Sequence, residues 1–124
     1  MWHNRSEPPS LKAVVWLGDS LRALKSFPSA VQDEVGYALF LAQRGEKHLA
    51  AKAMKGLGAG VMEVVADHRG NTFRAVYVVR LADRVYVLHT FQKKAKHGVA
   101  TPQTEIDLIK RRLKQAQAIS EGKE

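Results

Sequence analysis

Residues 84–98 of the chain read RVYVLHTFQKKAKHG. Apolar residues alternate along 84–91, which predicts a strand. A helix is expected to begin just after this stretch, near Thr101 and Pro102, because proline fits the first helical turn. Three lysines and His97 therefore lie on a short loop between two rigid elements. Cations held in this way could bind a phosphate backbone, and the imidazole could move a proton.

Two further strand-like runs precede this stretch, at residues 61–66 and 72–81. Gly70 and Asn71 tolerate positive φ angles and predict the turn between these two runs. Residues 82–83 predict a tight turn into the last strand. The three runs together indicate a meander of neighbouring strands.

The N-terminal half predicts a strand followed by a helical hairpin. Residues 13–17 form a short apolar run that suits a buried strand. Asp19 or Ser20 can cap the helix that follows. A second helix is expected to begin at Pro28 and to stop at Gly45.

The remaining segments complete an α+β pattern. Residues 45–60 are rich in Gly, Ala and Lys and are expected to form mainly a basic loop. A closing helix is expected from about Pro102 to Ile119. The element order is then β-α-α-β-β-β-α, which predicts an α+β fold. We expect a small, twisted, mainly antiparallel sheet packed against the helical hairpin and the C-terminal helix, with one helical layer on one sheet.

The length and composition predict one domain in the cytoplasm. A chain of 124 residues suits a single modest core, with 1–10 and 120–124 as flexible tails. Cysteine is absent, which excludes a disulfide framework and fits a reducing compartment. No apolar run approaches the ~18 residues that a membrane span needs, and the N-terminus lacks the apolar core of a signal peptide.

The charge balance points to a polyanionic partner. Twenty Lys and Arg residues against 12 Asp and Glu give a net charge of +8. A small domain this basic favours nucleic acid or an acidic protein as its partner. A solvated surface with a positive bias explains the charge equally well.

Four motifs occur in a fixed order over residues 12–117. They are the loop KAMKGLG at 52–58, the strand GVMEV at 60–64, the strand TFRAVY at 72–77, and LHTFQKK at 88–94 before the helix that carries Arg111 and Arg112. In this order they resemble the RelE/ParE superfamily of toxins from bacterial toxin–antitoxin systems, and most closely its phage-derived, HigB-like branch. Two positions depart from the pattern of that branch: Val65 stands where an arginine is common, and Met62 where an aromatic residue is usual.

The resemblance implies an mRNA interferase, a ribosome-dependent endoribonuclease that inhibits translation. A ribose 2′-hydroxyl would attack its own 3′-phosphodiester. This reaction needs a proton acceptor, a donor for the leaving 5′-oxygen, and cations that stabilise the phosphorane. It needs no metal and no other cofactor. The sequence agrees, because it has no cysteine, no HxxxH motif and no paired-carboxylate cluster.

The resemblance also implies the partners. These are the ribosome, mRNA and a cognate antitoxin of the helix-turn-helix type, with operator DNA reached only through the antitoxin. Two alternatives stay open: a non-enzymatic, ParE-like gyrase inhibitor, and an inactive phage-derived binding module of the same fold. The lysines and His97 favour the enzyme, whereas Val65 removes one candidate phosphate ligand.

Arg74 is the first candidate for the site. The period of two along its strand places it on one face with Val76, Val78 and Arg80. An unpaired cation is costly to bury at the centre of a sheet, so we expect Arg74 to face a groove and contact phosphate. The alternative is an ion pair with Glu63 on the adjacent strand.

The other candidates are basic residues around the same edge of the sheet. Lys93 and Lys94 sit where the last strand ends, and the resemblance favours phosphate binding over a merely soluble strand end. Neighbouring lysines favour the neutral form of His97, which could accept a proton. The predicted catalytic set is Arg74, Lys93, Lys94 and His97, and the predicted RNA-binding set is Lys52, Lys55, Arg111 and Arg112. A solvated loop and a solvated helix face are the simpler interpretations of the second set.

His89 lies within the last strand. The period of two places it on the same face as Val85 and Val87, with Phe91 beside them. A histidine in such a place is more often a satisfied core or groove residue than a base, so His89 is not a candidate base.

Overall fold

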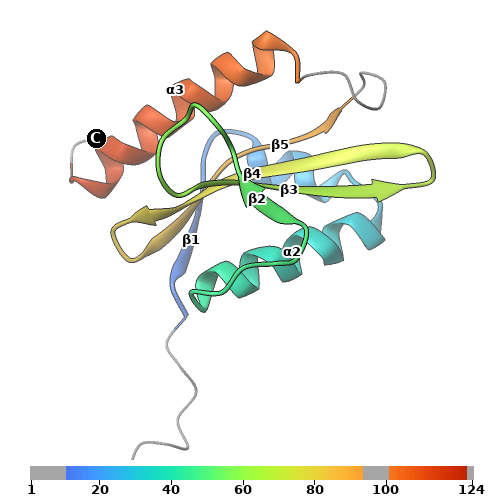
Figure 1. Cartoon of the computed structure of the whole chain (residues 1–124), viewed down its shortest axis with the longest axis horizontal. Helices are drawn as coiled ribbons and strands as arrows, with labels where there is room; N and C mark the ends of the chain where they lie inside the picture. Colours follow the sequence, from blue (N-terminus) through green and yellow to red (C-terminus); the bar gives the residue numbers. More distant parts are fainter. Residues whose placement is uncertain (1–10, 94–100, 123–124) are drawn as a thin grey trace, which may run out of the picture.

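The protein has an α+β fold, as predicted, with a twisted five-stranded mixed sheet and helices on both sides of it (Figure 1). The computed structural model describes residues 11–93 and 101–122. Along the chain these contain β1 (Ala13–Trp16), α1 (Ser20–Lys25), α2 (Ser29–Gln43), β2 (Ala51–Ala53), β3 (Val61–His68), β4 (Asn71–Leu81), β5 (Arg84–Lys93) and α3 (Gln103–Ser120). No helix in this part of the chain is long and apolar enough to cross a membrane.

The strand order is β1-β5-β4-β3-β2, and only the β1–β5 pair among these is parallel. The parallel pairing brings the start of α1 against the second half of β5. The Thr90 hydroxyl donates to the Ser20 carbonyl at 2.6 Å, and the Leu17 amide donates to the Val87 carbonyl at 2.9 Å. The loop between β1 and α1 is thereby fixed beside the residues of β5 that form the site.

The sheet separates two apolar cores. On one face, α1 and α2 pack Leu24, Val35 and Leu39 against the sheet. On the other face, α3 packs Ile109 and Ala116 against it. The expectation of a single helical layer is therefore wrong, because β4 and β5 carry apolar side chains on both faces and both faces must be covered.

Residues 45–60 contain a strand that the sequence did not predict. The three residues of β2 pair antiparallel with β3, so that Lys52 lies opposite Glu63. Ala-Lys-Ala has little intrinsic β propensity, and the pairing with β3 supplies the hydrogen bonds that hold it extended. The following loop, residues 54–60, is closed by a hydrogen bond from the Met54 amide to the Val61 carbonyl at 2.9 Å.

The two hairpin turns of the meander form where they were predicted. In the first turn the positive φ angles belong to Arg69 and Gly70, at 51° and 83°, whereas Asn71 already begins β4. In the second turn Ala82 has a φ of 53°. The two residues with positive φ angles therefore lie one position earlier than the predicted pair, Gly70 and Asn71.

A β-bulge at Leu88 reverses the side-chain alternation of β5. Tyr77 of β4 pairs with Val87, but the preceding Val76 pairs with His89, so Leu88 is an extra residue on β5. The prediction that His89 shares a face with Val87 is therefore wrong. His89 faces α3, and its ring stacks on that of Phe91 with centroids 4.6 Å apart.

A second irregularity in β4 turns Arg80 away from Arg74. Val78 and Leu81 both pack in the α3-side core, although they are three residues apart, and the register with β5 shifts between them. Arg80 lines a cavity on the α2 side together with Val79. The prediction that Arg80 shares the face of Arg74 is therefore wrong, while Val76 and Val78 do share it.

Candidate functional site

Three cations from three strands lie on the α3 side of the sheet. Lys52 of β2 lies opposite Glu63, which faces this side in register with Val76. Arg74 of β4 lies opposite Phe91, and Lys93 of β5 lies opposite Thr72, one pair further along. We call Lys52, Arg74 and Lys93 the cationic row. Its members come from distant parts of the sequence and are placed on one face by the strand register.

Arg74 is held by an ion pair. Its Nη1 lies 2.5 Å from Oε2 of Glu63, and the two side chains are 17% and 10% exposed. The Arg74 Nε is buried and has no hydrogen-bond partner among the described residues. The ion pair with Glu63, which the sequence left open as an alternative, is thus present. Contact of Arg74 with phosphate stays a prediction. Glu63 fixes the guanidinium on the sheet while leaving part of it exposed.

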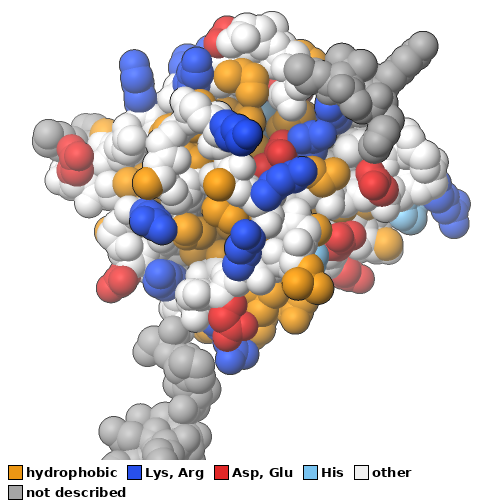
Figure 2. Space-filling view, in the orientation of Figure 1, with side chains coloured by type: hydrophobic (Ala, Val, Ile, Leu, Met, Phe, Trp, Pro, Cys, Tyr) orange, Lys and Arg blue, Asp and Glu red, His pale blue; other side chains and the backbone are white. Residues whose placement is uncertain are grey.

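The structure describes some of the other predicted basic residues and not others. Lys52 and Lys55 are exposed, and Lys93 is half-buried at the end of β5. Figure 2 shows Lys and Arg side chains gathered on the face that carries β2 and its following loop, around a small acidic area. The predicted residues Lys94 and His97 lie outside the described residues.

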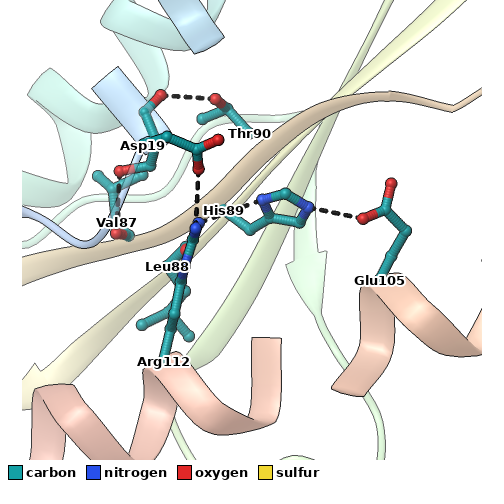
Figure 3. A network of polar contacts seen from close by, with 8 residues as sticks. Asp19, Val87, Leu88, His89, Thr90, Glu105 and Arg112 are labelled. Atoms are coloured by element: carbon teal, nitrogen blue, oxygen red, sulfur yellow. Dashed lines mark hydrogen bonds and ion pairs between the residues drawn. The ribbon is translucent and has the colours of Figure 1, made fainter. Parts of the chain in front are cut away.

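His89 is held between two charged side chains of α3 (Figure 3). Its Nε2 lies 2.9 Å from Oε1 of Glu105, and its Nδ1 lies 3.4 Å from Nη1 of Arg112. A guanidinium can only donate, so this arrangement assigns the acceptor lone pair to Nδ1 and the N–H to Nε2. The neutral tautomer that donates to Glu105 fits the site, which agrees with the interpretation of His89 as a satisfied groove histidine.

Arg112 connects α3 to two other elements (Figure 3). Its Nη1 donates to the Leu88 carbonyl at 3.0 Å, and its Nη2 donates to Oδ1 of Asp19 at 2.8 Å. Leu88 is the bulge residue, so Arg112 satisfies a carbonyl at the point where the β ladder is interrupted. The Arg112 side chain is only 12% exposed. The interpretation of Arg112 as part of a solvated helix face is therefore wrong, whereas Arg111 is exposed as expected.

The loop before α1 is shaped to receive Arg112. A Cβ on Gly18 would lie 2.5 Å from Arg112 Nη2, and Gly18 has a φ of 53°. Asp19 occupies the N-cap position of α1, but its side chain makes no capping hydrogen bond there. The hydrogen bond from Arg112 instead lowers the pKa of the Asp19 carboxyl below its ordinary 3.8. Asp19 is therefore the N-cap residue, one of the two that the sequence offered, but its side chain does not cap α1.

The cationic row and the acidic residues of the site differ in the ligands that they could hold. No group of three or more His, Asp or Glu side chains that could hold a metal occurs within the described ranges. The cationic row has one planar fork and two ammonium groups on one sheet face, a set whose chemistry suits phosphoryl oxygens.

The family model described as phage-derived protein Gp49-like (DUF891) matches residues 22–114. The chain belongs to this family. The Gp49-like family is a RelE-like, toxin-type family, and the match extends from α1 into α3. No curated protein and no solved structure matches this Gp49-like chain significantly. The finer placement in the HigB-like branch stays a prediction.

Two polar residues of this Gp49-like protein were missed from the sequence. Glu105 and Asp19 both hold basic groups of the site, His89 and Arg112 respectively. The sequence did contain a pattern that could have indicated Glu105. Glu105 and Arg112 are two helical turns apart and therefore share one face of α3. No comparable signal connected Asp19 to Arg112, because only the fold brings these positions together.

Proposed function

We propose that this Gp49-like protein is the toxin of a toxin–antitoxin pair and that it cleaves mRNA on the ribosome without a metal ion. The observation that carries the proposal is the cationic row, in which Lys52, Arg74 and Lys93 share one sheet face. The family supports the toxin assignment, and the chemistry of the row supports RNA as the target.

The proposed reaction is an internal transesterification. The ribose 2′-oxygen forms a bond to phosphorus, the bond from phosphorus to the 5′-oxygen breaks, and the products carry a 2′,3′-cyclic phosphate and a 5′-hydroxyl. Arg74 and the lysines stabilise the extra negative charge on the phosphorane. Glu63 acts as a positioning residue, because it holds the guanidinium of Arg74. Lys94 is the further proposed phosphate ligand. His97 is the proposed acceptor of the 2′-hydroxyl proton, and a water molecule gives the leaving 5′-oxygen the proton that makes it a hydroxyl.

Expression of the protein alone in bacteria tests this proposal. We expect growth arrest and cleavage of mRNA only where it is being translated, with 5′-hydroxyl ends that primer extension maps within reading frames. A control culture treated with a translation-initiation inhibitor before induction should keep its transcripts intact. Growth arrest with intact mRNA in both cultures would contradict the nuclease.

A second candidate is a non-enzymatic toxin or binding module of the same fold. It is favoured by one observation: Arg74 and Arg112, the two inward-facing arginines of the region, are each paired with a carboxylate. Val65, directly opposite Arg74, also supplies no additional cation where the related branch has one. Intact transcripts together with stalled DNA replication would support a gyrase inhibitor of the ParE type.

The proposed partners follow from the same assignment. They are a helix-turn-helix antitoxin, the ribosome and mRNA in the cytoplasm, with operator DNA bound only through the antitoxin. The net charge of +8 should speed association with an acidic partner. A small helix-turn-helix reading frame beside this gene would support the pairing.

A further inference from the structure

A cavity of about 280 Å³ opens on the α2 side of the sheet, on the face opposite to the cationic row. Apolar groups form its floor and charged groups its rim. The floor consists of Ala42, Met62, Tyr77 and Val79, and the rim carries Lys12, Lys47, Arg80 and Glu46. Figure 2 shows an apolar area in the lower half of the view that is bordered by Lys and Arg side chains.

The cavity exists because α2 ends before it has covered the sheet. The Gly45 amide donates to the Ala42 carbonyl, and the Glu46 amide donates to the Leu41 carbonyl at 2.7 Å. These two bonds form a Schellman motif, in which Gly45 has a φ of 79°. The chain turns away at this point, and the edge of the core beside Met62 stays open.

Arg80 is held at the rim by its contact with Gly60. A Cβ on Gly60 would lie 2.6 Å from Arg80 Cγ, so the aliphatic part of Arg80 rests on the glycine backbone. The irregularity in β4 directs this side chain towards the cavity, as described above. The guanidinium is therefore presented next to an apolar floor with part of its side chain already ordered, which lowers the entropic cost of binding an anion there.

We propose that this cavity receives an apolar side chain from an acidic segment of a partner protein. The rim carries three cations and one carboxylate, which complements a segment rich in Asp and Glu. The floor accommodates one aliphatic side chain. RNA is disfavoured as the occupant, because Tyr77 is only 2% exposed and offers no ring face on which a base could stack.

In the proposed toxin–antitoxin pair the acidic segment belongs to the antitoxin, and this last step rests on the proposed function. The binding chemistry of the cavity does not depend on it. The cavity and the cationic row lie on opposite faces of the sheet, so a partner could occupy the first while the second stays accessible to RNA.

The probe is a capped peptide, Asp-Glu-Leu-Glu-Asp, titrated into the protein with 13C-labelled methionine methyl groups. We expect the Met62 signal to shift saturably and the Met54 signal to stay in place, because Met54 packs on the α3 side. The peptide with serine in place of leucine should bind at least about 10-fold more weakly, as expected for one lost aliphatic side chain. A Met62→Leu variant assigns the signal.

Charge variants distinguish binding of the peptide at the cavity from long-range attraction to the net positive charge of the protein. Lys47→Glu and Arg80→Glu should each weaken binding of the leucine peptide about 5-fold or more. Lys114→Glu, an equal charge change on the exposed face of α3, should leave the affinity within about 2-fold. Lys47 is exposed in the loop after α2, so its variant tests the proposal even if Arg80→Glu disturbs the hairpin.

Three results would overturn the proposal. The first is a Met62 signal that does not shift at any peptide concentration. The second is an equal loss of affinity in Lys47→Glu and Lys114→Glu, which would show only long-range attraction. The third is a saturable Met62 shift with a single-stranded RNA oligonucleotide and none with the peptide. Each of these results is independent of whether the protein cleaves mRNA.

Discussion

The Arg112 guanidinium lies 2.8 Å from the Asp19 carboxylate and connects α3 to the loop between β1 and α1. The same guanidinium donates to the carbonyl of Leu88 at the β5 bulge and lies 3.4 Å from His89. One side chain therefore joins the last helix, the first loop and the last strand. The contact with Arg112 favours the His89 tautomer in which Nε2 donates to Glu105.

Arg112→Met should destabilise the protein, because methionine keeps much of the length of the side chain but has no hydrogen-bond donor. The substitution leaves the Leu88 carbonyl without its donor and the Asp19 carboxylate without its partner. We expect the free energy of unfolding in urea to fall by about 1–3 kcal/mol. The matched control is Arg111→Met on the exposed face of α3, which should change it by less than about 0.5 kcal/mol. Equal effects of the two variants would contradict a structural role for Arg112.

Asp19→Asn should change the dependence of stability on acid pH. The hydrogen bond from Arg112 lowers the pKa of Asp19 below 3.8 in the folded state. Its contribution is therefore fully present above the pKa of the unfolded chain and is lost as the pH falls through the folded pKa. The Asp19 side chain is 45% exposed, so the contribution should stay below about 1 kcal/mol. Melting temperatures of the two proteins should differ at pH 7 and converge as the pH falls below 3.8.

Tyr77→Phe should protect the protein against alkaline unfolding. Burial raises the pKa of the Tyr77 hydroxyl from 10.0 to about 12. The unfolded chain therefore loses this proton first, and stability is lost as the pH rises from 10.0 towards about 12. The loss attributable to this group is of the order of 2–3 kcal/mol. Urea unfolding at a series of alkaline pH values should show a shallower decline for Tyr77→Phe, and parallel declines would contradict the burial argument.

The sequence predicted the strands and helices where a periodic apolar pattern continued without interruption. The runs that became β3, β4 and β5 are rich in apolar residues, and the second helix of the hairpin is bounded by Pro28 and Gly45 much as expected. The sheet face of His89 could not be predicted. An extra residue at Leu88 reverses the period-two pattern, and nothing in the neighbouring sequence indicates this bulge. The short strand β2 was missed because pairing with β3, and not its own composition, makes it a strand.

The candidate site was predicted in part for the same physical reasons. Arg74 was placed on the correct face together with Val76, since no irregularity separates them. The Glu63 alternative was also foreseen, because neighbouring strands of a hairpin are close in sequence. The pairing of Asp19 with Arg112 joins positions 93 residues apart, and one sequence gives no information on such a contact.

The most direct test of the cationic row is the rate of mRNA cleavage by Arg74→Lys in a reconstituted translation reaction. Lysine keeps the charge beside Glu63 but loses the planar fork that can hold two phosphoryl oxygens. Arg74→Ala is less informative, because it would leave Glu63 only 10% exposed and unpaired, at a cost of about 3 kcal/mol or more. The matched control is Arg22→Lys on the exposed side of α1.

We predict that Arg74→Lys cleaves at least about 10-fold more slowly than the unaltered protein in single-turnover reactions, which corresponds to about 1.4 kcal/mol of lost transition-state stabilisation. Its melting temperature should stay within a few degrees, and Arg22→Lys should cleave at the original rate. Equal cleavage rates for Arg74→Lys and the unaltered protein would contradict the assignment of Arg74 to the phosphate. A slower rate explained entirely by a larger unfolded fraction would likewise show that Arg74 serves only as the ion-pair partner of Glu63.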